Sequence, residues 1–267
     1  MRNYQDEAVV IRQHKLGEAD RIITFLTAEH GLIRAVAKGI RRTRSRFGAR
    51  LEPFAHVHVN LYPGRSLDIV TQVHTLDAFS EAMSRDYSRY TTACAVLETA
   101  ERLAGEERAP AQQLYRLTVG ALTALAEDRR ERQQILDAFL LRAMGSAGWM
   151  PVLDVCARCA NPGPHKAFHV AAGGAVCVYC RPAGAATPTL GVLELMDALA
   201  RGHWADVAAA TPSQQRQATG LIAAHLQWHL ERRLRTLPLV ERDAPPNLAV
   251  QARPESPAQA APTATTA

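Results

Sequence analysis

The residues with the best-defined chemistry in this chain are four cysteines arranged as two closely spaced pairs. Cys156 and Cys159 form one C-x2-C pair, and Cys177 and Cys180 form the other after a spacer of 17 residues. Each pair places two sulfurs on one side of a tight turn, and two such pairs at this separation are typical of a zinc ion held by four thiolates. The spacing therefore predicts one structural zinc ion bound by all four cysteines.

Other uses of these cysteines fit the pattern less well. A single C-x2-C pair can be a redox pair, but two pairs in register seldom are. A catalytic zinc ion needs an open coordination position, and four thiolates leave none. Disulfides are disfavoured in the cytosol, where we expect this protein because the chain shows no signal-peptide pattern and no apolar run long enough to span a membrane. The fifth cysteine, Cys94, falls in an apolar helical pattern and is expected in the core.

The spacer and its flanking segments indicate how the cysteines are positioned. Within the spacer, AFHVAAGGAV predicts a hairpin with Gly173 and Gly174 at its turn, which brings the second pair beside the first. On both sides of this segment, apolar residues recur every three or four positions, as in helices. The helical stretches are 95–105, 112–127, 134–148, 189–202 and 211–236. We expect an all-α helical bundle over 79–238, with an inserted zinc-ribbon-like module at 152–187.

The last helical stretch begins with Thr211 and Pro212, which are typical of an N-cap and of the first helical residue. It also carries His225 and His229 one turn apart, the spacing of a two-histidine metal site. No third ligand lies near them in the sequence, so we interpret both as packing or surface residues. The chain has no Walker loop, dinucleotide fingerprint, G-x-S-x-G motif or acidic cluster for magnesium. There is no sequence reason to expect an enzyme.

The first 78 residues differ in texture from the helical part. Five short β-rich runs are separated by turn signals, namely EAVVIRQH, RIITFLT, GLIRAVAK, FAHVHVNLY and SLDIVTQVH. Five short strands predict a small barrel, for which the OB-fold, a frequent nucleic-acid binder, is the best-known match; an SH3-like barrel has a similar pattern. The fold class is therefore α+β and multidomain, with an OB-fold domain at 1–78. A disordered tail rich in Pro and Ala is expected at 239–267.

The strand expected at 54–62 is regular enough for its two faces to be assigned. The face expected in the barrel core consists of Ala55, Val57, Val59 and Leu61. The opposite face consists of Phe54, His56, His58, Asn60 and Tyr62. This aromatic and polar face has the composition of a platform on which bases stack. The alternative is an ordinary solvated face whose terminal aromatic residues are covered by loops.

A strongly basic segment lies between the third and fourth expected strands. The chain has a net charge of +5, but residues 31–50 alone carry seven basic and no acidic side chains. The seven cations are Arg34, Lys38, Arg41, Arg42, Arg44, Arg46 and Arg50. Arginines that serve only solubility are usually mixed with acids. We therefore expect a mobile loop at 38–50 that binds the phosphates of a nucleic acid.

These features together resemble the RecO recombination mediator proteins of bacterial DNA repair. The resemblance rests on DEAVVIRQHKLGEADRI near the N-terminus, on AVAKG before the arginines and on GGAVCVYC in the cysteine segment. It covers about residues 4–237. The high Ala and Arg content indicates an actinobacterial-type member.

The resemblance implies an N-terminal OB-fold, a helical domain and an inserted zinc module. It implies binding of single- and double-stranded DNA without sequence preference, with the seven cations named above at the family's basic DNA surface. Annealing of complementary strands is implied as well, including strands coated by single-strand-binding protein. The implied partners are RecR and the acidic C-terminal tail of single-strand-binding protein, which we expect to bind the helical domain, and indirectly RecA, which is loaded onto DNA. The implied location is cytoplasmic and nucleoid-associated, without a membrane.

Two rival interpretations remain open from the sequence. One is a generic nucleic-acid-binding module with an OB-fold and zinc, for example an RNA- or ribosome-associated protein, that does not anneal strands. The other is a pure scaffold.

Overall fold

The computed structural model describes residues 3–230 and 232–240. Its N-terminal part is a closed barrel of five strands in the order β1-β2-β3-β5-β4, in which β3 and β5 pair in parallel and the other pairs are antiparallel. The strands are β1 Tyr4–Leu16, β2 Asp20–Thr27, β3 Gly31–Ala37, β4 His56–Tyr62 and β5 Asp68–Asp77. This barrel confirms the expected OB-fold.

The rest of the described chain is mainly helical. The helices are α1 Phe79–Ser84, α2 Tyr87–Leu103, α3 Gln112–Ala126, α4 Arg132–Ser146, α5 Val192–Arg201, α6 Trp204–Ala209, α7 Pro212–His229 and α8 Leu237–Val240. Between α4 and α5, a two-stranded sheet joins β6 Ala167–His169 to β7 Gly174–Val176. None of the helices in the described part is long and apolar enough to cross a membrane. The tail expected at 239–267 lies outside the described residues from 241 onward.

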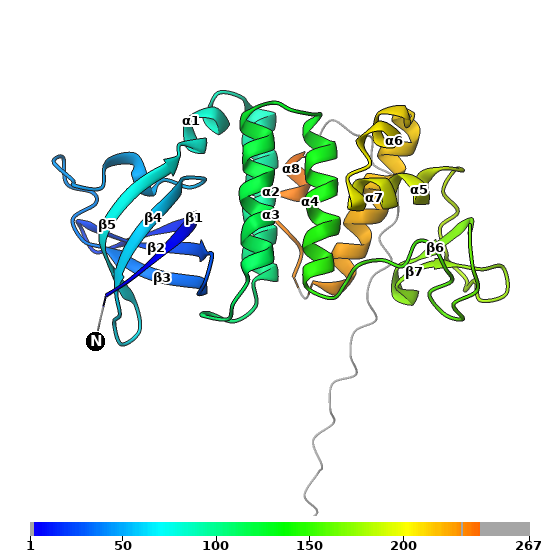
Figure 1. The fold of residues 1–267 in the computed structure, drawn as a ribbon, viewed down its shortest axis with the longest axis horizontal. Helices are drawn as coiled ribbons and strands as arrows, with labels where there is room; N and C mark the ends of the chain where they lie inside the picture. The colour runs from blue at the N-terminus through cyan, green and yellow to red at the C-terminus, as the bar shows by residue number, and fades with distance from the viewer. Residues whose placement is uncertain (1–2, 231, 241–267) are drawn as a thin grey trace, which may run out of the picture.

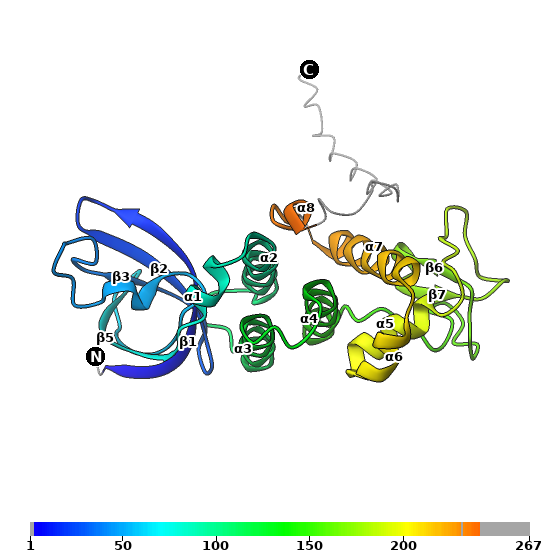
Figure 2. The same ribbon diagram turned by 90° about the horizontal axis from the view of Figure 1, so that it is seen from above.

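The elements follow one another along an elongated molecule (Figure 1). The barrel lies at one end, and α2 and α3 stand against it. Helix α4 comes next, then α5, α6 and α7, and the β6–β7 sheet lies at the opposite end, as the view from above also shows (Figure 2). The chain returns at α8, where the Glu98 carboxylate on α2 accepts hydrogen bonds from the backbone N–H groups of Arg235 and Thr236.

Helix α7 begins at the predicted capping residues but ends earlier than predicted. Thr211 caps α7 in a reciprocal capping box with Gln214, and Pro212 is the first helical residue, as predicted. The helix then ends at His229, seven residues before the predicted end at 236, so the prediction of a helix through 236 is wrong. Leu234 and Leu237 are instead buried in the helical core after the turn, which explains the apolar spacing that extended the prediction.

The barrel interior is filled by alternate residues of its strands. As predicted, Ala55, Val57, Val59 and Leu61 are all buried in this core. The connection between β3 and β4 contributes two further buried residues, Phe47 and Leu51, the second within a 3-10 turn at Gly48–Leu51. The basic segment is therefore anchored to the barrel from inside.

One part of the barrel's outer surface belongs to the helical core. Val9, Leu26, Leu32 and Phe54 are buried in the same cluster as the apolar residues of α2, α3 and α4. Phe54 meets the ring of Tyr90 on α2 edge-on, with ring centroids 5.5 Å apart.

His56, which begins β4 two residues after Phe54, is also covered by helices. His56 is 7% exposed, and its Nε2 lies 2.7 Å from the hydroxyl of Tyr115 on α3. Its Nδ1 lies 2.7 Å from the Asp77 carboxylate. The interpretation of this face as a base-stacking platform is therefore wrong for Phe54 and His56, because the helices occupy the position that bases would need.

The connection between α2 and α3 forms a polar clamp on the barrel. The Arg108 backbone N–H donates to the Leu32 carbonyl, and its guanidinium Nη2 lies 2.7 and 2.8 Å from the two carboxylate oxygens of Asp68. Asp68 is fully buried and also accepts a hydrogen bond from the Tyr4 hydroxyl. A buried carboxylate without such donors is strongly destabilising, so this clamp helps to hold barrel and helices together.

Gly31 at the start of β3 makes the close approach of this connection possible. Its φ is +67°, and a Cβ at this position would lie 1.8 Å from the carbonyl oxygen of Ala109. Gly17, in the β1–β2 turn, has a similar φ of +56° but open space around its Cβ position. The two glycines thus share the backbone constraint and differ in the contact.

We expect Gly31→Ala to lower the free energy of unfolding more than Gly17→Ala. Gly17→Ala carries only the cost of a left-handed backbone, about 1 kcal/mol, whereas Gly31→Ala adds a backbone clash that pushes the α2–α3 connection off the barrel. Urea unfolding of both variants measures the difference. Equal losses would contradict the view that this connection is packed tightly on β3.

Candidate nucleic-acid interface and cysteine cluster

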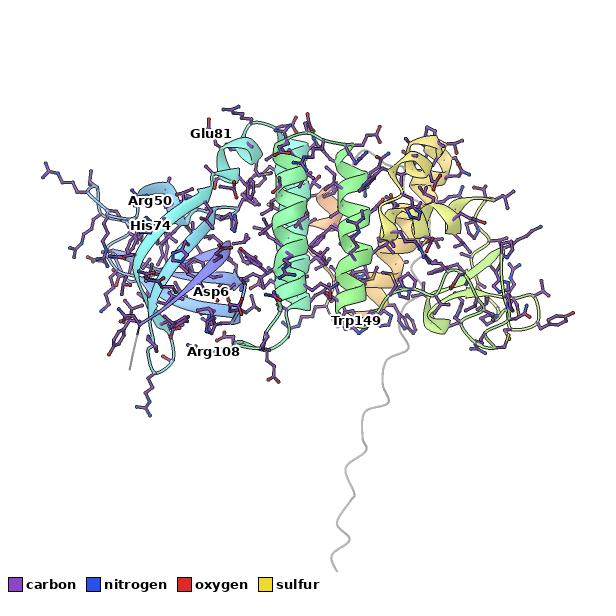
Figure 3. All side chains as sticks on the ribbon, viewed as in Figure 1. Asp6, Arg50, His74, Glu81, Arg108 and Trp149 are labelled. Atoms are coloured by element: carbon purple, nitrogen blue, oxygen red, sulfur yellow. The ribbon has the colours of Figure 1, made fainter. Side chains whose placement is uncertain are left out.

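The basic segment lies at the barrel end of the molecule, in the connection from β3 to β4. Its cations at Lys38, Arg41, Arg42, Arg44, Arg46 and Arg50 are all exposed. Arg50 is seen beside the barrel strands, far from the β6–β7 sheet (Figure 3). Arg34, the seventh predicted cation, is not in the loop but on the outer face of β3. Six of the seven residues are thus gathered in one solvated connection.

The backbone of this connection is held in place at its start. The Gly39 N–H donates to the Asp20 carboxylate at 2.7 Å, and the Arg41 N–H donates to the Ala19 carbonyl at 2.9 Å. Further along, Phe47 is inserted into the barrel core. The expectation of a mobile loop is therefore too simple, because the backbone is tethered while the arginine side chains extend into solvent.

The charges of the connection are largely uncompensated. Within the described residues, Arg41 and Arg50 donate only to backbone carbonyls, those of Gly17 and Arg46, and none of the six loop cations forms an ion pair. Arg34 differs, because its Nη1 lies 3.4 Å from the Glu107 carboxylate in the α2–α3 connection. A concentration of unpaired guanidinium groups is suited to an anionic polymer.

Sequence reasoning missed Arg12 on β1 as a neighbour of this surface. Strand pairing places Arg12 opposite Thr24 and Thr24 opposite Arg34, so the two arginines flank one residue of β2. A register shift after Val10 sets this alignment. The shift has no clear signal in the sequence, which is why the alignment could not be found there.

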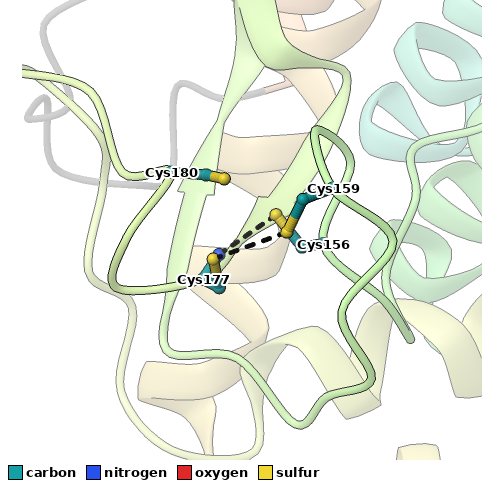
Figure 4. Close-up of side chains that lie close together, drawn as sticks. All are labelled: Cys156, Cys159, Cys177 and Cys180. Carbon is teal, nitrogen blue, oxygen red and sulfur yellow. Dashed lines mark hydrogen bonds between the residues drawn. The ribbon is translucent and has the colours of Figure 1, made fainter.

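The four cysteines come together at the other end of the molecule (Figure 4). Their four sulfurs all lie within 4.8 Å of one another, and those of Cys159 and Cys177 are 3.8 Å apart. Cys156 and Cys177 are buried, whereas Cys159 is exposed and Cys180 is half-buried. The predicted hairpin is present as β6 and β7, with Gly173 in a left-handed turn conformation and Gly174 beginning β7.

The electrostatics of the cluster suit a divalent cation. The Cys177 backbone N–H donates to the Cys156 sulfur at 3.4 Å and helps to lower the pKa of that thiol to about 6. Hydrogen bonds with the sulfurs of Cys159 and Cys177 raise the pKa of Cys180 to about 12. Several adjacent thiolates are therefore unfavourable without a cation, and a dication would stabilise them. The set of four sulfurs fits a closed tetrahedral zinc site.

The cysteine module is joined to the helices by aromatic contacts. Phe168 on β6 is buried in the helical core, and its ring meets that of His225 on α7 with centroids 5.9 Å apart. The His225 Nε2 donates to the Trp149 carbonyl at 3.0 Å, and the Trp149 ring stacks on His229. Trp149 lies at the foot of the helical part, where the chain leaves α4 for the module (Figure 3). The two histidines are therefore packing residues, as interpreted from the sequence.

Two family models match this chain. The model for the N-terminal part of recombination protein O matches residues 1–79, and the model for its C-terminal part matches residues 84–238. The first covers the barrel, and the second covers α2 to α7 together with the cysteine module.

Protonation of His225 generates a pH dependence of stability. Burial lowers the pKa of His225 to about 4, and its Nδ1 has no hydrogen-bond partner within the described residues. The unfolded chain takes up this proton near the ordinary pKa of about 6.5, so acid favours unfolding. We expect the free energy of unfolding to fall by up to about 3 kcal/mol as the pH drops from about 6.5 to about 4.

The measurement is urea unfolding at a series of pH values. His225→Gln should remove this part of the pH dependence, whereas His74→Gln, a change of an exposed histidine on β5, should preserve it. An identical pH profile for the wild-type chain and for His225→Gln would contradict the assignment.

Proposed function

This chain belongs to the recombination protein O family of DNA repair and recombination mediators, and from that premise we propose that it binds single- and double-stranded DNA through its β3–β4 connection and anneals complementary strands. With RecR, it would help to load RecA onto DNA coated by single-strand-binding protein. The observation that carries the proposal is the group of six exposed cations at 38–50, none of which forms an ion pair within the described residues.

Annealing by such a surface needs no covalent step. Two phosphate backbones repel each other, and a surface that neutralises both allows them to approach while their base edges remain free to pair. Arginine side chains on a tethered backbone suit this task, because they contact phosphates and carry no sequence information. Arg34 on β3 extends the proposed contact from the connection onto the barrel face.

The proposed division of labour follows the family. Residues 1–78 form the DNA-binding domain, and residues 79–238 contribute the partner contacts. The family implies DNA binding and an interaction with RecR in general. We further propose that the helical domain recognises the acidic C-terminal tail of single-strand-binding protein, with arginine side chains close to apolar ones. The proposed link to RecA is indirect, through its loading onto DNA.

For the cysteine cluster we propose one structural zinc ion held by Cys156, Cys159, Cys177 and Cys180. The support is the small size of the module's own core. Among the described residues, the buried members of that cluster besides Cys156 and Cys177 are Ala167 and Val176. Such a core stabilises little by burial alone, and small modules of this kind usually need a metal or disulfides. When bound, zinc would supply four metal–sulfur bonds that hold the two cysteine pairs together.

Replacing Arg41, Arg42, Arg44 and Arg46 with Ala should weaken binding to single-stranded DNA and flatten its salt dependence. Loss of up to four phosphate contacts should reduce the slope of log K against log salt by about 2–3, equally for oligonucleotides of different sequence. Fluorescence anisotropy titrations at several salt concentrations measure this slope.

The control carries the same loss of charge at four exposed arginines outside the connection, with Ala at Arg102, Arg116, Arg216 and Arg232. Its slope should stay close to that of the unaltered chain. Equal slopes for the two variants would refute the proposed contact. In the same samples, the unaltered chain should speed annealing of strands coated by single-strand-binding protein and bind that protein's acidic tail peptide. Binding to bare nucleic acid without annealing would favour the generic module.

Metal analysis of the purified full chain should find one zinc ion per molecule. Cys156→Ser should abolish it and lower the free energy of unfolding by several kcal/mol, because structural zinc sites bind with about 10–16 kcal/mol in peptides. Cys94→Ser is the matched control, since Cys94 lies on α2 outside the cluster and should leave zinc content unchanged. Metal-free protein with four reactive thiols at the cluster would overturn the assignment.

A further inference from the structure

A groove of about 180 Å³ lies where the outer face of the barrel meets the helical part. Arg12, Thr24 and Arg34 line it from β1, β2 and β3, and Glu101 and Glu107 line it from α2 and the α2–α3 connection. The barrel thus supplies the hydrogen-bond donors of the groove, and the helical part supplies its carboxylates.

The base of the groove holds an unused polar group. Thr24 is 3% exposed, and its hydroxyl has no hydrogen-bond partner within the described residues. Arg12 and Arg34 stand directly opposite it on the two neighbouring strands. A buried hydroxyl without a partner costs about 1–3 kcal/mol. Two guanidinium groups on either side of a free hydroxyl form a set of donors suited to the oxygens of a phosphate.

The two carboxylates occupy the guanidinium groups in this structure. Arg12 Nη2 lies 2.5 Å from Glu101 Oε1, and Arg34 Nη1 lies 3.4 Å from Glu107 Oε1. The arginine side chains are 51% and 44% exposed, so each pair contributes only about 0–1 kcal/mol. Separating either pair is therefore cheap for a competing anion. The Arg108–Asp68 clamp and the His56–Tyr115 contact would still hold barrel and helices together.

The groove lies on the same side of the barrel as the start of the basic connection. Arg34 precedes Lys38 by four residues, which is about 13 Å along a strand. Between them the outer face of the sheet carries the aligned residues His14, Ile22 and Val36, which are exposed or half-buried. A nucleic-acid backbone that leaves the connection along this face reaches the groove.

We propose that Arg12, Thr24 and Arg34 form a second phosphodiester contact for single-stranded DNA, which Glu101 and Glu107 close when DNA is absent. The proposal rests on the proposed function, because DNA bound at the basic connection brings the backbone to this face. The carboxylates act as intramolecular competitors, and DNA must displace both of them before both arginines are available.

The first test changes the carboxylates. The double variant Glu101→Gln and Glu107→Gln should bind an oligothymidine several-fold more tightly at low salt. Its salt slope should stay close to that of the unaltered chain, because the same two arginines meet phosphates in both and only the competition by the carboxylates is removed. The control is Glu81→Gln with Glu127→Gln, which removes the same charge from two exposed ion pairs, with Arg85 and Arg129, outside the groove. Equal behaviour of the two double variants would overturn the proposal.

The second test uses Thr24→Val, which keeps the branched shape of the side chain and replaces its hydroxyl with a methyl group. The variant should be at least as stable to urea as the unaltered chain, because the hydroxyl has no partner in the fold, yet it should bind oligothymidine several-fold more weakly. If the hydroxyl had a purely structural role, its removal would lower the stability and leave DNA binding unchanged. This result would refute the proposal.

Taken together, the DNA-binding measurements on these variants distinguish a failure of the groove proposal from a failure of DNA binding at the basic connection. If the quadruple arginine variant loses salt slope and Arg12→Ala does not, DNA binds at the connection and the groove is not a contact. If the quadruple variant keeps its slope, the proposed function fails first. If both lose slope and Arg12→Ala abolishes the gain from Glu101→Gln, both proposals are supported.

Discussion

The joint between barrel and helices is the contact on which the arrangement of this molecule depends. Apolar residues of the barrel's outer face, including Leu32 and Phe54, are buried in the same core as α2 and α3. A five-stranded barrel of this size buries limited apolar surface by itself, so sharing a core with the helices adds stabilisation. The buried Asp68 carboxylate, held by Arg108, adds a polar contact that requires one relative placement of the two parts.

This joint also decides which barrel surfaces remain available to DNA. Helices cover Phe54, just before β4, and His56 at its start, together with the nearby rows of β1, β2 and β3. The far part of the β1–β3 face stays open, together with the basic connection that follows β3 and exposed residues of β5 such as His74. The helical part contributes Glu101 and Glu107 beside this remaining surface, so the same joint that stabilises the fold places negative charge near the arginines.

The cysteine module lies at the opposite end of the molecule, separated from the barrel by the helices (Figure 1). It meets the helices at α7, where the ring of Phe168 contacts that of His225, and His225 is in turn bonded to the Trp149 carbonyl just after α4. Gly174 brings it close to the chain leaving α4, since a Cβ there would lie 2.1 Å from the Val152 carbonyl oxygen. This location favours a structural role for the cluster over a shared contact with DNA at the basic connection.

Features that depend on neighbours along the chain could be predicted from residue types and their spacing. The cysteine spacing, the capping of α7 by Thr211, the alternation in β4 and the cluster of cations at 38–50 are local, and local geometry follows from residue type and spacing. The wrong inferences involve partners distant in sequence. The platform, one of two interpretations of the face with Phe54 and His56, is wrong, and so is the longer α7, because tertiary packing decides whether an apolar or aromatic residue faces water, a helix or the core. The alignment of Arg12, Thr24 and Arg34 likewise depends on a register shift and on pairing across three strands. These placements follow from three-dimensional packing, since burial and strand register are set by contacts between segments that no local pattern records.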